Sequence, residues 1–162
     1  AGFTLEFATS VLMVLMICGA FGRIFGGVLG DRIGALPGYI LMSLGQTVFV
    51  VWFPHLNSPA GIYLLAAFFG FTYSGVMSSI LVCTRMMVSA KYGARAMSLT
   101  SFFGWIGMGL GGFLGGYFFD VYGDYSWAFT FAGIMGLINL VILSQFWLRI
   151  RNAKKGLEGL EP

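Results

Sequence analysis

The sequence predicts an all-α, polytopic membrane protein with five transmembrane helices and no separate soluble domain. Three observations favour this fold class: an apolar composition, five apolar segments of membrane-spanning length, and basic residues in alternate connections between them. The chain of 162 residues is 58% hydrophobic and only 9% charged, and its mean hydropathy is +0.87. A soluble domain carries about 25% charged residues because its surface faces water. The surface of this chain is therefore expected to face lipid.

Five segments are long and apolar enough to form membrane-spanning helices. Crossing about 30 Å of hydrocarbon takes about 20 mostly apolar residues. Segments of this kind cover residues 8–30, 38–56, 60–83, 98–119 and 126–148. In the breaks between them, Ser58 before Pro59 predicts the N-cap of the third helix, and Ser126 predicts that of the fifth. Residues 1–155 are thus expected to form one helical unit, followed by a disordered tail over residues 156–162.

Basic residues indicate how the helices are oriented. Lysine and arginine in short loops mark the cytoplasmic side of a membrane protein. They occur in the first break, in and beside the third, and after the last span, as Arg32, Arg85, Lys91, Arg95, Arg149, Arg151, Lys154 and Lys155. The second and fourth breaks contain none. We therefore predict a multi-pass protein of the plasma or inner membrane, with its N-terminal end outside and its C-terminal tail in the cytoplasm.

Two rows of glycine predict close contacts between helices. The first span carries Gly22, Gly26 and Gly30, and the fourth carries Gly107, Gly111 and Gly115. Small residues at a spacing of four allow the backbones of two membrane helices to approach each other. The rows serve packing alone, or they also let helices slide past one another; the sequence leaves both interpretations open.

A charged motif fills the first break, which reads Gly27-Val28-Leu29-Gly30-Asp31-Arg32-Ile33-Gly34. It resembles the G-x-x-x-D-R-x-G cytoplasmic loop of the major facilitator superfamily, although Ala35 stands where that family usually carries arginine or lysine. The resemblance implies a gate formed by Gly27, Asp31, Arg32 and Gly34. Asp31 would accept hydrogen bonds from the N-terminal end of a neighbouring helix, where the helix dipole favours an anion. A plain Asp-Arg loop that caps a helix end is the alternative.

Glycine and aromatic residues in the later spans suggest which part of that fold this is. The third span contains Phe68-Phe69-Gly70-Phe71, and the fourth ends with Gly115-Gly116-Tyr117-Phe118-Phe119-Asp120. This pattern is similar to the last three helices of the monocarboxylate transporters and the related oxalate/formate antiporters. The resemblance covers about residues 3–150. It implies helices eight to twelve of a twelve-helix fold, with the N-terminal part of the same transporter as the missing partner.

Arg23 is the one charged residue well inside a predicted span. A buried arginine costs about 3 kcal/mol on insertion scales, so it is expected to face a wet cavity or a partner. Its planar guanidinium matches a carboxylate bidentately, and the family resemblance aligns it with a substrate-binding arginine of the eighth helix. The alternative is a structural arginine, because a Gly-Arg pair before the loop motif is widespread in the superfamily.

Two departures from the family limit this assignment. Gly19 stands where the family often carries an aspartate tied to proton coupling, so a coupled proton is a candidate partner without that route. The fourth span also lacks the lysine of the oxalate type, which favours a monocarboxylate over a dicarboxylate as small as oxalate. The other candidates for the cavity wall are polar or aromatic residues near mid-membrane: Tyr73, Ser78, Phe102 and Trp105.

The leading functional hypothesis is a secondary transporter that moves a small organic anion by alternating access, with binding near the bilayer midplane. A membrane-embedded enzyme would need a nucleophile–base pair, paired carboxylates or a metal cluster. The sequence offers one histidine, His55, and scattered acids, so we expect no enzyme, catalytic residue, metal, cofactor or nucleic-acid partner. A five-helix accessory subunit that does not itself transport is the alternative function.

Overall fold

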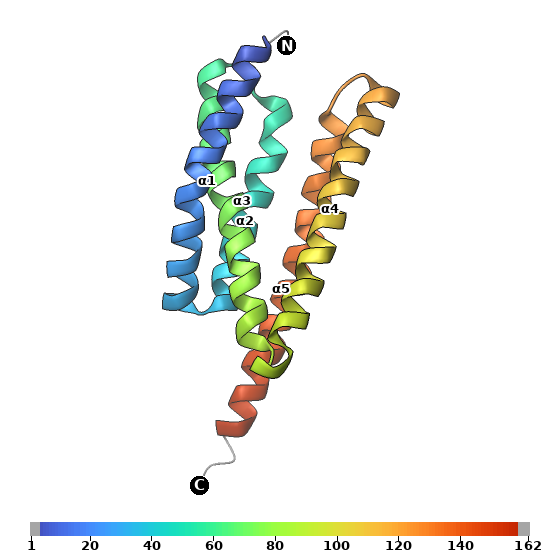
Figure 1. Cartoon of the computed structure of the whole chain (residues 1–162). Coiled ribbons are helices and arrows are strands. Elements are labelled where there is room, and N and C mark those ends of the chain that lie inside the picture. Colours follow the sequence, from blue (N-terminus) through green and yellow to red (C-terminus); the bar gives the residue numbers. More distant parts are fainter. Residues whose placement is uncertain (1–3, 159–162) are drawn as a thin grey trace.

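The computed structural model describes residues 4–158 and confirms the predicted fold class. Five long helices run back and forth, so the first and last described residues lie at opposite ends of the molecule (Figure 1). All five are long and apolar enough to cross a membrane. Their bounds are α1 Leu5–Ile33, α2 Ala35–Trp52, α3 Pro59–Met87, α4 Gly93–Tyr122 and α5 Ser126–Glu158. Two short 3-10 helices, η1 Phe53–His55 and η2 Ala90–Tyr92, follow α2 and precede α4.

The starts of α3 and α5 can be compared with the capping residues predicted from the sequence. Ser58 caps α3 as predicted, because its hydroxyl accepts a hydrogen bond from the Gly61 amide at 3.2 Å and Pro59 is the first helical residue. The predicted cap of α5 is wrong by one residue, because Tyr125 holds the cap position and its carbonyl oxygen accepts from the Phe129 amide at 3.1 Å. Ser126 is already helical, and its amide donates to the Asp124 carboxylate at 2.9 Å. α5 continues to Glu158, and residues 159–162 of the predicted tail lie outside the described residues.

α1, α2 and α3 form a closely packed group, seen on one side of Figure 1. The glycine row of α1 lies against α3. A Cβ atom built on Gly22 would overlap the backbone of Phe71, and one built on Gly26 would lie 2.8 Å from the Gly75 carbonyl oxygen. The predicted close approach therefore exists for this row. It brings two backbones into direct contact, as small residues do between membrane helices.

α2 connects this group to α5. Leu36, Tyr39 and Met42 of α2 pack in one buried cluster with Val76 of α3 and Leu143 of α5. The side chain of Asn139 on α5 donates a hydrogen bond to the Ser43 hydroxyl at 2.9 Å. These contacts hold α5 against α2 along the middle of both helices.

α4 is the least buried helix. It has no buried residue, and it touches the rest of the described chain through limited contacts with α3, α5 and η2 (Figure 1). A Cβ atom built on Gly107, Gly111 or Gly115 would meet no atom within 4 Å. The predicted close helix contact of this second row is therefore not made by any helix that the structure describes.

Candidate substrate pocket and gate loop

A pocket of about 320 Å³ lies between α1, α3 and α4, and we call it the arginine pocket. α1 contributes Arg23 alone. α3 and α4 supply the remaining walls: Tyr73, Met77, Ser78, Ile80, Leu81, Thr100, Ser101, Gly104, Trp105 and Met108. The pocket therefore combines one cation with hydroxyls, two aromatic rings and two thioethers.

Helical periodicity brings these side chains together. Tyr73, Met77 and Ile80 are spaced by four and three, and so share one face of α3. Ser101, Trp105 and Met108 share a face of α4 by the same spacing. Arg23 reaches the pocket because its neighbour Gly22 lies against Phe71, which leaves the next residue at the edge of the α1–α3 contact.

The electrostatics of the arginine pocket favour an anion. Arg23 is exposed, and its charge acts on the Tyr73 hydroxyl. No acidic side chain among the described residues lines the pocket. The Thr100 hydroxyl already donates to the Ala96 carbonyl oxygen at 2.9 Å, whereas no hydrogen bond within the described chain engages the Ser78 and Ser101 hydroxyls. These two hydroxyls and the guanidinium are donors available to a ligand.

The structure brings together four of the residues that the sequence nominated. Arg23, Tyr73, Ser78 and Trp105 line one pocket. Phe102 does not line it; its ring is 60% exposed and packs edge-on against that of Phe103. Phe102 directly follows Ser101, and the turn of about 100° per residue points it away from the wall that Ser101 and Met108 form.

The gate motif occupies the end of α1 and the connection to α2. Asp31 and Arg32 lie in the last turn of α1 and are exposed. Gly34 alone separates the two helices, with φ 99°, a backbone conformation that favours glycine. Gly27 has open space around its Cα. No hydrogen bond between described residues joins Asp31 to a neighbouring helix.

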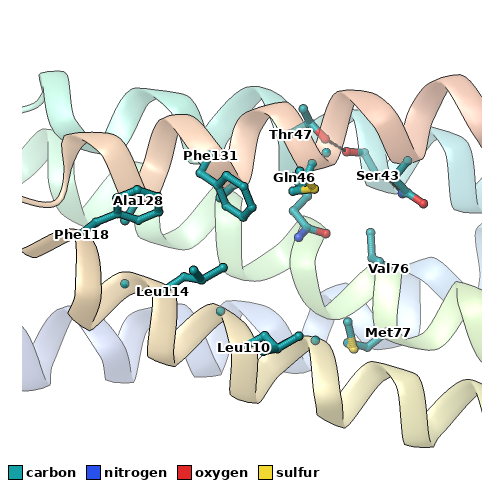
Figure 2. Close-up of a pocket in the computed structure, with 17 residues that line it drawn as sticks. Ser43, Gln46, Thr47, Val76, Met77, Leu110, Leu114, Phe118, Ala128 and Phe131 are labelled. Carbon is teal, nitrogen blue, oxygen red and sulfur yellow. Dashed lines mark hydrogen bonds between the residues drawn. The ribbon is translucent and has the colours of Figure 1, made fainter.

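A larger pocket, of about 560 Å³, lies between α4 and α5 and extends to α2 and α3; we call it the α4–α5 pocket. Leu110 and Leu114 of α4, Phe131 of α5 and Gln46 of α2 point into it (Figure 2). Its lining also includes the glycine row of α4 and a row of small residues on α5: Ala128, Ala132 and Gly136. Neither Arg23 nor any other charged side chain lines it.

A family model described as the Major Facilitator Superfamily matches residues 1–161. The chain belongs to this superfamily. The match confirms the assignment made from the loop motif. It also confirms that the chain comes from a superfamily of transporters and not from an enzyme family.

This superfamily chain is also similar to a curated protein of yeast. Over 97 residues it is 29% identical to the riboflavin transporter MCH5 of Saccharomyces cerevisiae. The matched segment covers 58% of this chain and 19% of the yeast protein, so the chain spans less than a fifth of its relative's length. No solved structure matches the chain.

Sequence reasoning missed several lining residues of this superfamily chain. Thr100, Ser101 and Met108 belong to the arginine pocket but were not nominated. Ser101 could have been found, because it precedes Trp105 by four residues and therefore shares its helical face. Met77 follows Tyr73 by the same spacing. Residue types taken singly do not indicate these neighbours, whereas the helical register does.

Proposed function

We propose that the protein containing this chain is a secondary transporter that moves a small organic anion, most simply a monocarboxylate, by alternating access. One observation carries the proposal: Arg23 is the one charged residue lining the arginine pocket, and no described acidic side chain neutralises it there. An uncompensated guanidinium at membrane depth is costly unless a ligand or water satisfies it. A carboxylate fits its two parallel N–H donors.

The remaining walls of the pocket suit an organic anion better than an inorganic one. Trp105 and Tyr73 offer aromatic surface to the non-polar part of a ligand, and Ser78 and Ser101 offer hydroxyl donors. The five helices would belong to a larger transporter whose other half completes the site. Its membrane would be the plasma or inner membrane, with the basic ends of the helices in the cytoplasm.

In the family, an aspartate tied to proton coupling often stands one turn before the arginine, and proton coupling in this protein would need a different group. Gly19 occupies that position and is buried, and a Cβ atom there would lie 2.5 Å from the Ser74 hydroxyl oxygen. A carboxylate at this place would displace α3. A coupled proton would therefore be carried by another group.

The test is uptake by the complete transporter, using radiolabelled monocarboxylates. We expect Arg23→Gln to abolish uptake at unchanged surface expression. Arg23→Lys is expected to keep a small part of it, because lysine retains the charge without the bidentate fork. Arg85→Gln is the matched control, since Arg85 is exposed in the last turn of α3 and lies outside the pocket. Normal affinity in Arg23→Gln would make Arg23 structural and end the carboxylate assignment.

The similarity to a riboflavin transporter supports a second candidate, a larger heteroaromatic substrate held between Tyr73 and Trp105. Riboflavin carries no carboxylate, so its uptake would depend on the aromatic walls and much less on Arg23. Measuring riboflavin uptake beside the monocarboxylates in the same Arg23 variants separates the two candidates. A third candidate, a non-transporting accessory subunit, is favoured if the purified chain binds no organic anion and copurifies stoichiometrically with another protein.

A further inference from the structure

Four aromatic rings form a continuous row between the start of α5 and the arginine pocket, and we call them the aromatic row. Phe129 of α5 stacks on Phe53 of η1, with ring centroids 5.4 Å apart and ring planes at 10°. Phe53 meets Phe69 of α3 edge-on, at 5.4 Å and 90°. Phe69 in turn stacks on Tyr73, at 5.7 Å and 17°. These separations lie in the range that aromatic pairs prefer.

Tyr73 is the member of the aromatic row that reaches the arginine pocket. It lines that pocket, whereas Phe69, Phe53 and Phe129 do not. Phe69 precedes Tyr73 by four residues, so the two side chains lie one above the other on the same face of α3. Phe69 therefore covers one side of the Tyr73 ring. A ligand in the pocket would contact the part of the ring that Phe69 leaves free.

Phe53 holds the middle of the aromatic row in place. It is the first residue of η1, which lies between α2 and α3, and it contacts one ring from α5 and one from α3. Phe53 and Phe69 are both half-buried. A ring packed between two others has few orientations open to it. The orientation of Phe69, and through it that of Tyr73, thus depends on a connection at the end of the helices.

The neighbouring Phe68 takes no part in the aromatic row. It directly precedes Phe69, and the turn of about 100° per residue points it in another direction. Its ring stacks on that of Phe49 on α2, with centroids 5.5 Å apart, and it is 49% exposed. Two adjacent phenylalanines of one helix therefore differ in their contact with the pocket wall, which makes Phe68 a matched control for Phe69.

We infer that Phe69, held by Phe53, is a positioning residue that fixes the Tyr73 ring in the wall of the arginine pocket and so favours ligands with a flat non-polar part. Without the Phe69 ring, Tyr73 gains space along α3 and can turn away from the pocket. An anion that lacks a flat non-polar part gains nothing from this orientation. The preference for ligands rests on the proposed function, whereas the orientation of the Tyr73 ring does not.

Fluorine NMR of the complete transporter in detergent tests the inference. 3-Fluorotyrosine replaces Tyr73, and its resonance reports on the surroundings of that ring. Titration with benzoate, and separately with acetate, gives the affinity for an aromatic carboxylate and for one without a ring. The same measurements are made in Phe69→Leu, Phe53→Leu, Phe69→Tyr and the control Phe68→Leu.

We expect Phe69→Leu to shift the resonance of residue 73 and to weaken benzoate binding about fivefold, the effect of one lost aromatic contact. Acetate binding should stay unchanged, which a general loss of structure would not allow. Phe53→Leu should act in the same direction more weakly, and it decides the test if Phe69→Leu does not fold. Phe69→Tyr, which keeps a ring at this place, should match the wild type, as should Phe68→Leu.

Three results would overturn the inference. They are an unchanged resonance in Phe69→Leu, an equal shift in Phe68→Leu, and a wild-type resonance that does not respond to benzoate. Arg23→Gln in the same titration separates the inference from the proposed function. Normal benzoate affinity in Arg23→Gln, with weakened binding in Phe69→Leu, would end the carboxylate assignment and support the positioning role. Loss of binding in Arg23→Gln, with no effect of Phe69→Leu, would do the reverse.

Discussion

The side-chain amide of Asn139 on α5 donates a hydrogen bond to the Ser43 hydroxyl on α2 at 2.9 Å. Both residues also line the α4–α5 pocket, and Ser43 is buried. The bond therefore holds together two helices that are far apart in the sequence, at the inner wall of the pocket. Because hydrocarbon offers no competing partner, such a bond keeps much of its strength across a membrane helix contact.

The Asn139–Ser43 bond is expected to contribute measurably to stability. A double-mutant cycle with Asn139→Leu and Ser43→Ala should show a coupling of about 0.6 kcal/mol, the usual size for hydrogen bonds between membrane helices. The measurement is reversible unfolding of the complete protein in detergent. Strictly additive effects of the two changes would show that the bond does not contribute.

The α1–α3 contact should tolerate no side chain at Gly22. Gly22→Leu would force α1 away from Phe71, and we expect a loss of about 2 kcal/mol or more in stability, as for other overpacked sites. Gly27→Leu is the matched control on the same helix, because a Cβ atom there meets nothing within 4 Å. Thermal unfolding of the two variants in detergent compares them, and equal melting temperatures would contradict the close approach.

Trp105 and Phe102 should differ in their effect on transport, although they lie one turn apart on α4. Trp105 lines the arginine pocket and Phe102 does not. Trp105→Ala is expected to raise the apparent KM about fivefold, the effect of losing about 1 kcal/mol of aromatic contact. Phe102→Ala should leave KM unchanged. Initial uptake rates over a range of substrate concentrations check this, and the reverse order would exclude the arginine pocket as the site.

If the loop motif is a gate, Asp31 should control the balance between the inward-open and the outward-open state of the transporter. Asp31→Asn removes the charge that would hold the closed state, and is expected to shift the protein from one state to the other with little change in intrinsic substrate affinity. Accessibility of a cysteine placed at Ser101 reports the shift through its rate of maleimide labelling. Glu6→Gln, at the far end of α1, is the control. Identical labelling rates in wild type and Asp31→Asn would leave Asp31 as a helix-end residue.

The helices could be predicted from the sequence because apolar length and composition decide them almost alone. The start of α3 depends on adjacent residues alone, because Ser58 caps the helix and Pro59 is its first residue. The end of α1 is also local, because Gly34 adopts a positive φ that ends the helix. α5 begins at Ser126, which is also the first residue of the expected fifth segment, but Ser126 is helical and does not cap the helix. Asp124 and Ser126 are both good capping residues, so residue type alone does not choose between them.

The partners of the glycine rows could not be predicted, because spacing shows that a helix face is smooth but not which helix covers it. Gly22 and Gly111 belong to rows of identical spacing, yet one is pressed against Phe71 and the other faces open space. The candidate site shows the same limit. Arg23 was found from its charge and from the family resemblance. Phe102 was nominated in place of Ser101 because residue type, taken without the helical register, does not show which face of α4 lines the pocket.

Gly34 is the whole connection between α1 and α2, and this has a consequence for how the protein is made. A one-residue turn leaves no length for a loop that could cross or wait outside the bilayer while the second helix is synthesised. We therefore expect α1 and α2 to enter the membrane together as a hairpin. Asp31 and Arg32 at its tip would then stay on one face of the membrane throughout biogenesis.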